Sequence, residues 1–169
     1  MTEPTALKQL ATELALYRTP PMELLTRWQL LLGEDRIDYL DAALDTGTSV
    51  PGTRYTFLAI TDVAVCYLVA ESDDEYWEHD PHGFHSGRLR PPLTAWRRPL
   101  TAVTEIGLTE DSRDWWPDEI QSRAQRPAIR LLVGGDALQI PLYSRRMNQP
   151  QPDVAQIIAR LTKVWRTST

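Results

Sequence analysis

The chain has 169 residues and a mass of 19.3 kDa, which suits one ordinary domain with a helical extension and is too short for two large domains. With 42% hydrophobic and 24% charged residues, its composition excludes a wholly disordered, collagen-like or disulfide-based architecture. The charge is uneven, because residues 1–80 carry 15 acidic and 5 basic side chains whereas residues 81–169 carry 8 and 13. The net charge of −5 argues against non-specific nucleic-acid binding.

The single cysteine and the start of the chain bear on the cellular compartment. Cys66 lies in an apolar run at residues 63–69, where we expect it to be a small buried side chain. One cysteine cannot form an intrachain disulfide, which favours a reducing compartment. The first six residues carry one acidic side chain, Glu3, and lack the features of a signal peptide, and no stretch reaches 18 apolar residues. We therefore expect a cytoplasmic protein without a transmembrane segment.

Residues 1–50 are predicted to form an N-terminal helical region. Apolar residues recur at spacings of three and four over residues 5–17 and over residues 22–32, the second run beginning after Pro21 and ending at Gly33. A weaker run, in which Ile37, Leu40 and Leu44 share one side, predicts a third helix. A domain boundary is expected at residue 50, with a second region over residues 51–169.

The second region is predicted to be rich in strands. Its strand-like runs are aromatic and β-branched and are bounded by turn residues; they lie at residues 54–60, 63–70, 100–108, 128–133 and 137–143. Gly134-Gly135 predicts a tight hairpin, and Pro141 should end the last strand or place it at an edge. Residues 154–165 follow Asp153, a suitable N-cap, with the apolar spacing of an amphipathic helix.

Three histidines, His79, His82 and His85, follow an acidic stretch at residues 71–80. Imidazoles beside carboxylates could bind zinc, nickel or copper in a mobile loop, which would suit a metal-dependent hydrolase. However, Pro81 and Gly83 disfavour the helix on which this spacing works best. We favour a solvated loop with incidental histidines over a specific divalent-metal site, and the chain shows no other motif that requires a cofactor.

Basic residues gather around Pro91-Pro92, with a tryptophan among them. The members of this cluster are Arg88, Arg90, Trp96, Arg97 and Arg98. If the fold brings them together, they would form a surface for an anionic lipid head group or an acidic peptide, with Trp96 adding stacking. Alternatively, the basic residues complement the acidic first half of the same chain. Trp77, Trp115 and Trp116 lie in aperiodic segments, which either fold back over the core or present a partner surface.

The order of strands in residues 53–166, with the polar Thr61-Asp62 turn in the first hairpin and the closing helix at Asp153–Trp165, resembles the bacterial pleckstrin-homology-like (PH-like) domains. The resemblance implies an α+β fold: a strongly bent antiparallel sheet or partial barrel with a C-terminal amphipathic helix, here preceded by helices. The connection at residues 71–99 is longer than a hairpin loop. Only five strands are evident, so residues 96–98 or 109–118 would have to supply the rest.

The resemblance implies a binding scaffold, since such domains serve as adaptors, lipid or peptide binders and assembly modules. We therefore expect a non-enzymatic cytoplasmic module that mediates protein–protein contacts. An inhibitor of the immunity-protein or antitoxin type is a further hypothesis for a small acidic chain.

Overall fold

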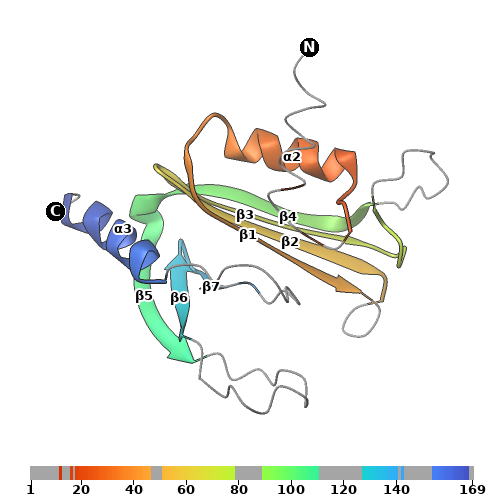
Figure 1. The fold of residues 1–169 in the computed structure, drawn as a ribbon. Coiled ribbons are helices and arrows are strands. Elements are labelled where there is room, and N and C mark those ends of the chain that lie inside the picture. Colours follow the sequence, from red (N-terminus) through yellow and green to blue (C-terminus); the bar gives the residue numbers. More distant parts are fainter. Residues whose placement is uncertain are drawn as a thin grey trace. The chain divides into compact units, whose positions relative to one another are not determined.

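The structure is a computed structural model, which describes residues 12, 16, 18–46, 51–78, 89–110, 127–140, 142 and 154–167. The chain forms two compact units (Figure 1). Unit 1 comprises residues 1–99 and 142–150, and unit 2 comprises residues 100–141 and 151–169. Each unit combines an antiparallel sheet with helix, so the fold is α+β, as the sequence predicts.

Unit 1 contains helix α2 (Met22–Leu32) and the strands β1 (Ile37–Thr46), β2 (Thr53–Thr61), β3 (Ala64–Ser72) and β4 (Leu89–Pro99), which form one sheet in the order β1-β2-β3-β4. Unit 2 contains a short 3-10 helix η1 (Leu100–Ala102), the strands β5 (Val103–Glu110), β6 (Pro127–Val133) and β7 (Asp136–Ile140), and helix α3 (Val154–Thr167). Its sheet order is β5-β6-β7. All described strand pairs are antiparallel.

Helix α2 lies across one face of the sheet of unit 1 (Figure 1). It begins after Pro21 and ends at Gly33, whose φ of 67° lies in the left-handed region and whose N–H donates to the carbonyl of Gln29. Its buried face is formed by Leu24, Leu25, Trp28 and Leu32. The helix predicted over residues 22–32 is therefore confirmed.

The predicted third helix is wrong, because residues 37–46 form strand β1. β1 pairs with β2 in a register that sets Ala42 opposite Phe57 and Leu44 opposite Tyr55. Alternate residues of β1 thus reach the core, a period of two that competes with the helical spacing of Ile37, Leu40 and Leu44. The predicted boundary at residue 50 lies inside unit 1, between these two paired strands.

The core of unit 1 fills the space between α2 and the sheet. Trp28 of the helix contacts Phe57 of β2, with ring centroids 5.5 Å apart. Tyr55, also on β2, makes an edge-to-face contact with Trp77, and their ring centroids lie 5.6 Å apart. Trp77 is only 2% exposed, so its segment folds back over the core, which was one of the two predicted roles. Trp115 and Trp116 lie outside the described residues.

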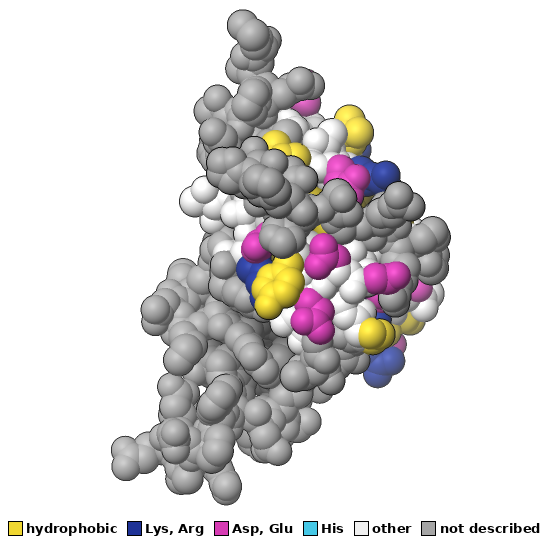
Figure 2. Space-filling view, turned by 90° about the vertical axis from the view of Figure 1, so that its right-hand side faces the viewer, with side chains coloured by type: hydrophobic (Ala, Val, Ile, Leu, Met, Phe, Trp, Pro, Cys, Tyr) yellow, Lys and Arg dark blue, Asp and Glu magenta, His cyan; other side chains and the backbone are white. Residues whose placement is uncertain are grey.

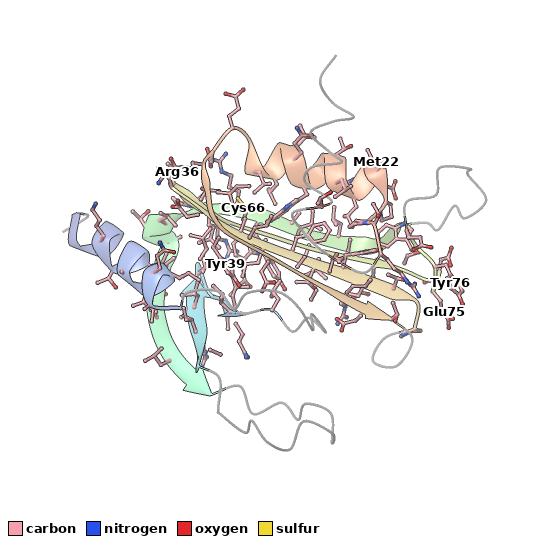
Figure 3. All side chains as sticks on the ribbon, in the orientation of Figure 1. Met22, Arg36, Tyr39, Cys66, Glu75 and Tyr76 are labelled. Atoms are coloured by element: carbon pink, nitrogen blue, oxygen red, sulfur yellow. The ribbon has the colours of Figure 1, made fainter. Side chains whose placement is uncertain are left out.

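Backbone acceptors hold the segment after β3 against the sheet. The hydroxyl of Tyr55 donates to the carbonyl of Trp77 at 2.8 Å, and that of Thr53 donates to the carbonyl of Asp74 at 2.6 Å. Gly52 has a φ of 93°, and a Cβ there would lie 1.9 Å from the carbonyl oxygen of Ser72. Figure 2 shows acidic side chains grouped on the end of unit 1 at which Figure 3 labels Glu75 and Tyr76.

Unit 2 contains the predicted strands with shifted bounds, since Leu100–Ala102 form η1 and the strand predicted at residues 100–108 is observed as Val103–Glu110. Gly134 and Gly135 have φ values of 53° and 93°, as a tight hairpin between β6 and β7 requires. β7 ends at Ile140, immediately before Pro141, and is an edge strand. The predicted closing helix is α3, which packs on η1 and β6 and buries Ile157 and Leu161.

No helix in the described part of the chain combines the length and the apolar character that crossing a bilayer requires.

Trp28 gives a test of this core. Its side chain is fully buried, yet its indole N–H has no hydrogen-bond acceptor among the residues that the structure describes. Trp28→Ala should lower the free energy of unfolding by about 3–5 kcal/mol, because it opens a large cavity. Trp28→Phe should stay within about 1 kcal/mol of the wild type, since it removes an unsatisfied donor and little volume. Urea denaturation measures both values. Equal losses would mean that the indole N–H has a partner, such as a buried water.

Candidate functional site

Strand β4 places the residues of the predicted basic cluster on opposite faces of the sheet. In the register, Trp96 pairs with Tyr67, whereas Arg97 pairs with Cys66. Because successive side chains of a strand point to opposite faces, Trp96 and Arg98 share one face of the sheet and Arg97 lies on the other. Arg90 occupies a position of β4 opposite Glu71, and Arg88 lies outside the described residues. Of the predicted set, the described side chains that come together are therefore Trp96 and Arg98.

Arg97 lies on the face that α2 covers. Its Nη2 donates to Oδ2 of Asp35 at 2.5 Å, in the connection between α2 and β1. A Cβ at Gly33 would lie 3.7 Å from Nη1 of Arg97, so the guanidinium also sits beside the C-terminal end of the helix. This arginine joins an outer strand to the helix connection. Its role is the internal pairing of basic and acidic segments that the sequence offered as an alternative.

Tyr67, Trp96 and Arg98 form a stacked group on the opposite face of the sheet, called here the aromatic platform. The rings of Tyr67 and Trp96 lie directly across the two strands, with centroids 5.3 Å apart and planes inclined by 36°. The Cζ of Arg98 lies 4.3 Å from the centroid of Trp96. All three side chains are partly exposed.

The chemistry of the aromatic platform follows from this stacking. The indole attracts the guanidinium through the face of its π-system. A stacked guanidinium still presents N–H donors around its edge, in the plane suited to a carboxylate or phosphate. The platform therefore combines apolar ring surface with donors for an anion. Sequence reasoning identified Trp96 and Arg98 but missed Tyr67, whose place depends on the β3–β4 register.

On the same face of the sheet, the residues next to the platform lead to an ion pair between Arg54 and Glu71. The register sets Thr56, Val69 and Thr94 in one row across β2, β3 and β4. Farther along, Arg54 and Glu71 are cross-strand partners, with Nη2 of the arginine 2.5 Å from Oε1 of the glutamate. The ion pair of Arg54 with Glu71 therefore lies on the same sheet face as the platform, beyond the row of Thr56, Val69 and Thr94.

Asp41 is a buried polar group that the sequence did not reveal as a candidate. It lies in β1 with only 6% exposure, and its carboxylate accepts hydrogen bonds from three donors. These donors are the hydroxyl of Tyr39 at 3.0 Å, the N–H of Ala42 at 2.8 Å and the N–H of Leu142 at 2.6 Å. Such donors offset the desolvation of a buried carboxylate. Asp41 thereby ties residue 142 back to unit 1.

Cys66 is confirmed as a buried side chain on the face that α2 covers (Figure 3). Its Sγ donates to the carbonyl of Leu31 at 3.7 Å. Desolvation raises the pKa of the thiol from 9.0 to about 11, and the positive charge of Arg97 opposes part of that rise. A thiol of this kind is a poor nucleophile near neutral pH.

The histidines proposed as metal ligands, His79, His82 and His85, lie outside the described residues. Among the residues that the structure does describe, no group of three or more histidine, cysteine, aspartate or glutamate side chains is arranged to hold a metal ion.

No family model matches the chain, and neither a curated protein nor a solved structure matches it.

The buried thiol predicts a dependence of stability on alkaline pH. Since the pKa is 9.0 for the exposed thiol and about 11 in the fold, the unfolded chain loses this proton first as pH rises. The stabilisation is complete below pH 9 and is lost between about pH 9 and 11, by about 3 kcal/mol in all. Denaturant unfolding of the wild type and of Cys66→Ala at several pH values measures it. Parallel pH profiles for the two proteins would contradict the shift.

Because Arg97 and Arg98 lie on opposite faces of the sheet, we expect them to differ in their energetic coupling to Asp35. In double-mutant cycles, Asp35→Asn with Arg97→Gln should give a coupling of about 0.5–1 kcal/mol, typical of a partly exposed ion pair. Asp35→Asn with Arg98→Gln should give a coupling of zero within error, because Arg98 lies on the other face. Chemical denaturation of the five variants and the wild type measures both. A coupling as large for Arg98 would contradict the assigned faces.

Proposed function

We propose that this protein is a non-catalytic binding module that recognises an anionic group of a protein partner through the aromatic platform of Tyr67, Trp96 and Arg98. The observation that carries the proposal is the partly exposed guanidinium of Arg98 stacked on Trp96, with Tyr67 across the strand pair. Tryptophan, tyrosine and arginine are the residues that most often dominate binding energy at protein interfaces.

A rigid support favours a binding role for this surface. The platform stands on β3 and β4, which pair with each other at these residues, so less backbone freedom remains to be lost on association than in a loop. β3 is in turn held by the core, where Leu68 and Cys66 on its other face are completely buried. A pre-ordered surface of this kind suits recognition of one partner geometry.

Two other arginines of unit 1 take part in ion pairs within the chain. Arg97 is engaged by Asp35, and Arg54 is engaged by Glu71. The raised pKa of Cys66 argues against this thiol as a nucleophile.

We also propose that the two units belong to a PH-like architecture. This is supported by the order of elements, in which a four-stranded antiparallel sheet is followed by a three-stranded sheet and a closing helix. β4, which contains residues 96–98, provides a strand that the sequence pattern left open. A cytoplasmic location is part of the same proposal, because the free buried Cys66 requires no oxidising compartment.

The proposal can be tested with two anionic probes. Fluorescent poly-L-glutamate represents the carboxylates of a protein partner, and phosphatidylcholine vesicles with and without phosphatidylserine represent a membrane. The wild type should bind poly-L-glutamate, and Arg98→Gln and Trp96→Ala should each weaken binding by about tenfold or more, because they remove a charged donor or its stacking partner. Fluorescence anisotropy at low ionic strength measures the affinity.

Arg27→Gln is the matched control, since it removes one exposed arginine from α2 and should leave the affinity unchanged. Circular dichroism of each variant verifies folding. Equal binding by the wild type and Arg98→Gln would contradict the proposed surface. Binding to phosphatidylserine vesicles without binding to poly-L-glutamate would replace the protein partner by a lipid surface.

A further inference from the structure

Strand β5 is the outer strand of the sheet in unit 2 (Figure 1). The order β5-β6-β7 pairs it with β6 on one side, and in the described part of the chain no strand pairs with its other side. Alternate backbone N–H and C=O groups of an outer strand face away from the sheet, where one more strand can pair with them. β5 contains no proline, whereas β4 contains three and β7 ends immediately before Pro141. β5 therefore lacks the residue type that blocks backbone pairing at an edge.

The apolar face of this sheet loses its cover at β5. The register sets Leu108 directly across from Ile129, and Ile129 directly across from Ile140, so the three side chains form one row on one face. Ile129 and Ile140 are fully buried, but Leu108 is 73% exposed. Ile106, in the next row toward η1, is only partly buried. An apolar strip of β5 thus faces solvent beside the open edge.

Gly107, between these two residues of β5, is not required by the fold of a single chain. Its φ is not in the left-handed region, and a Cβ there would make ordinary contacts with Arg130 and Glu105, the nearest at 3.9 Å. A glycine inside a strand is destabilising, and it often marks a site where another chain or group approaches closely. A close neighbour from outside the chain would account for this glycine.

Two exposed charges flank Gly107 on the face opposite to Leu108. Glu105 lies two positions before it on β5, and Arg130 lies directly across from it on β6. Neither side chain forms an ion pair with another residue that the structure describes. A charge at a sheet edge disfavours pairing with an arbitrary strand. The occupant of this edge must therefore bring a positive charge near Glu105 and a negative charge near Arg130.

A second copy of this chain meets both requirements. When two β5 strands pair antiparallel about a two-fold axis at Ile106, Glu105 of each copy lies opposite Gly107 of the other. Because that glycine has no side chain, Glu105 can reach past it to Arg130 on the adjoining β6, across two strand spacings or about 10 Å between Cα atoms. On the other face, Ile106 meets Ile106 of the second copy, and Leu108 packs diagonally against the same side chain.

We infer that this protein forms a two-fold homodimer in which the β5 strands of two copies pair antiparallel with Ile106 at the axis. The pairing joins two three-stranded sheets into one continuous sheet. Two equivalent ion pairs between Glu105 and Arg130 fix the register, and Ile106 and Leu108 bury their exposed surface. Since one strand pair buries a small area, the dimer is reversible. The inference does not depend on the proposed function, because the aromatic platform belongs to unit 1.

Charge reversal tests the register. Sedimentation equilibrium of the full-length protein, at concentrations up to about 1 mM, measures the dimer. Glu105→Arg and Arg130→Glu should each weaken it at least about tenfold, because each places like charges across the interface. The double variant should recover most of the lost affinity, since the exchanged charges again face each other. Glu34→Arg, which reverses an exposed acidic residue of unit 1, is the matched control and should leave the dimer unchanged.

Gly107→Val tests the close approach at the glycine. A branched side chain between Glu105 and Arg130 of the two copies should weaken the dimer at least about tenfold. The urea midpoint of the monomer should stay the same or rise, because valine favours strands. Hydrogen exchange at Glu105–Leu108 should slow as the protein concentration rises, with β7, the other outer strand of this sheet, unchanged as the internal control. Circular dichroism verifies the folding of every variant.

The outcomes decide the inference directly. A protein that stays monomeric at about 1 mM would leave this edge to a different partner and overturn the homodimer. A dimer that tolerates both single reversals, or that protects β4 or β7 in place of β5, would place the contact on another surface and overturn it as well. Weakening by the single reversals without recovery in the double variant would overturn the Glu105–Arg130 register. Arg98→Gln should leave the dimer unchanged, so a failure here and a failure of the proposed function are distinguishable.

Discussion

The apolar face of the four-stranded sheet must be kept from water, and α2 provides its cover. Trp28 on the helix and Phe57 on β2 are the centre of that contact, and both are fully buried. To lie over the sheet, the helix must end and the chain must turn back into β1, which Gly33 allows. The same turn brings Asp35 within reach of Arg97, so the covered face of β4 becomes part of the structural framework. Trp96 and Arg98 lie on the opposite face of the strand, where both are partly exposed.

Much of the secondary structure was predictable because its signals are local. The periodicity of α2 and α3 and the Gly134-Gly135 hairpin were predicted close to their observed bounds. β1 was not, because its residues 37–46 carry both a helical spacing and an alternating one. Pairing with β2 decides between the two, since it gives hydrogen-bond partners to the backbone groups on that side of β1. Such pairing is a tertiary effect, which the sequence of one segment does not encode.

The candidate site was predictable only in part, for a related reason. Trp96 and Arg98 are close in sequence, so a basic and aromatic cluster was evident. Arg97 appeared equivalent to Arg98, although the two-residue period of a strand sends them to opposite faces. The sequence pattern predicted a connection, not a strand, at residues 71–99, so it gave no reason to expect neighbouring side chains there on opposite faces. Tyr67 and Asp41 depend on strand register and on contacts with distant residues, which no short motif records.

The hydrogen bond between Asp41 and the backbone of Leu142 spans 101 positions of the chain. The segment between them contains all of β5, β6 and β7, which belong to unit 2, before residue 142 returns to unit 1. During synthesis on a ribosome, the first sheet emerges long before this donor does. Unit 1 can therefore collapse early, but it completes the hydrogen bonding of its buried carboxylate only after three strands of unit 2 have been made. Such long-range closure raises contact order and slows the final step of folding.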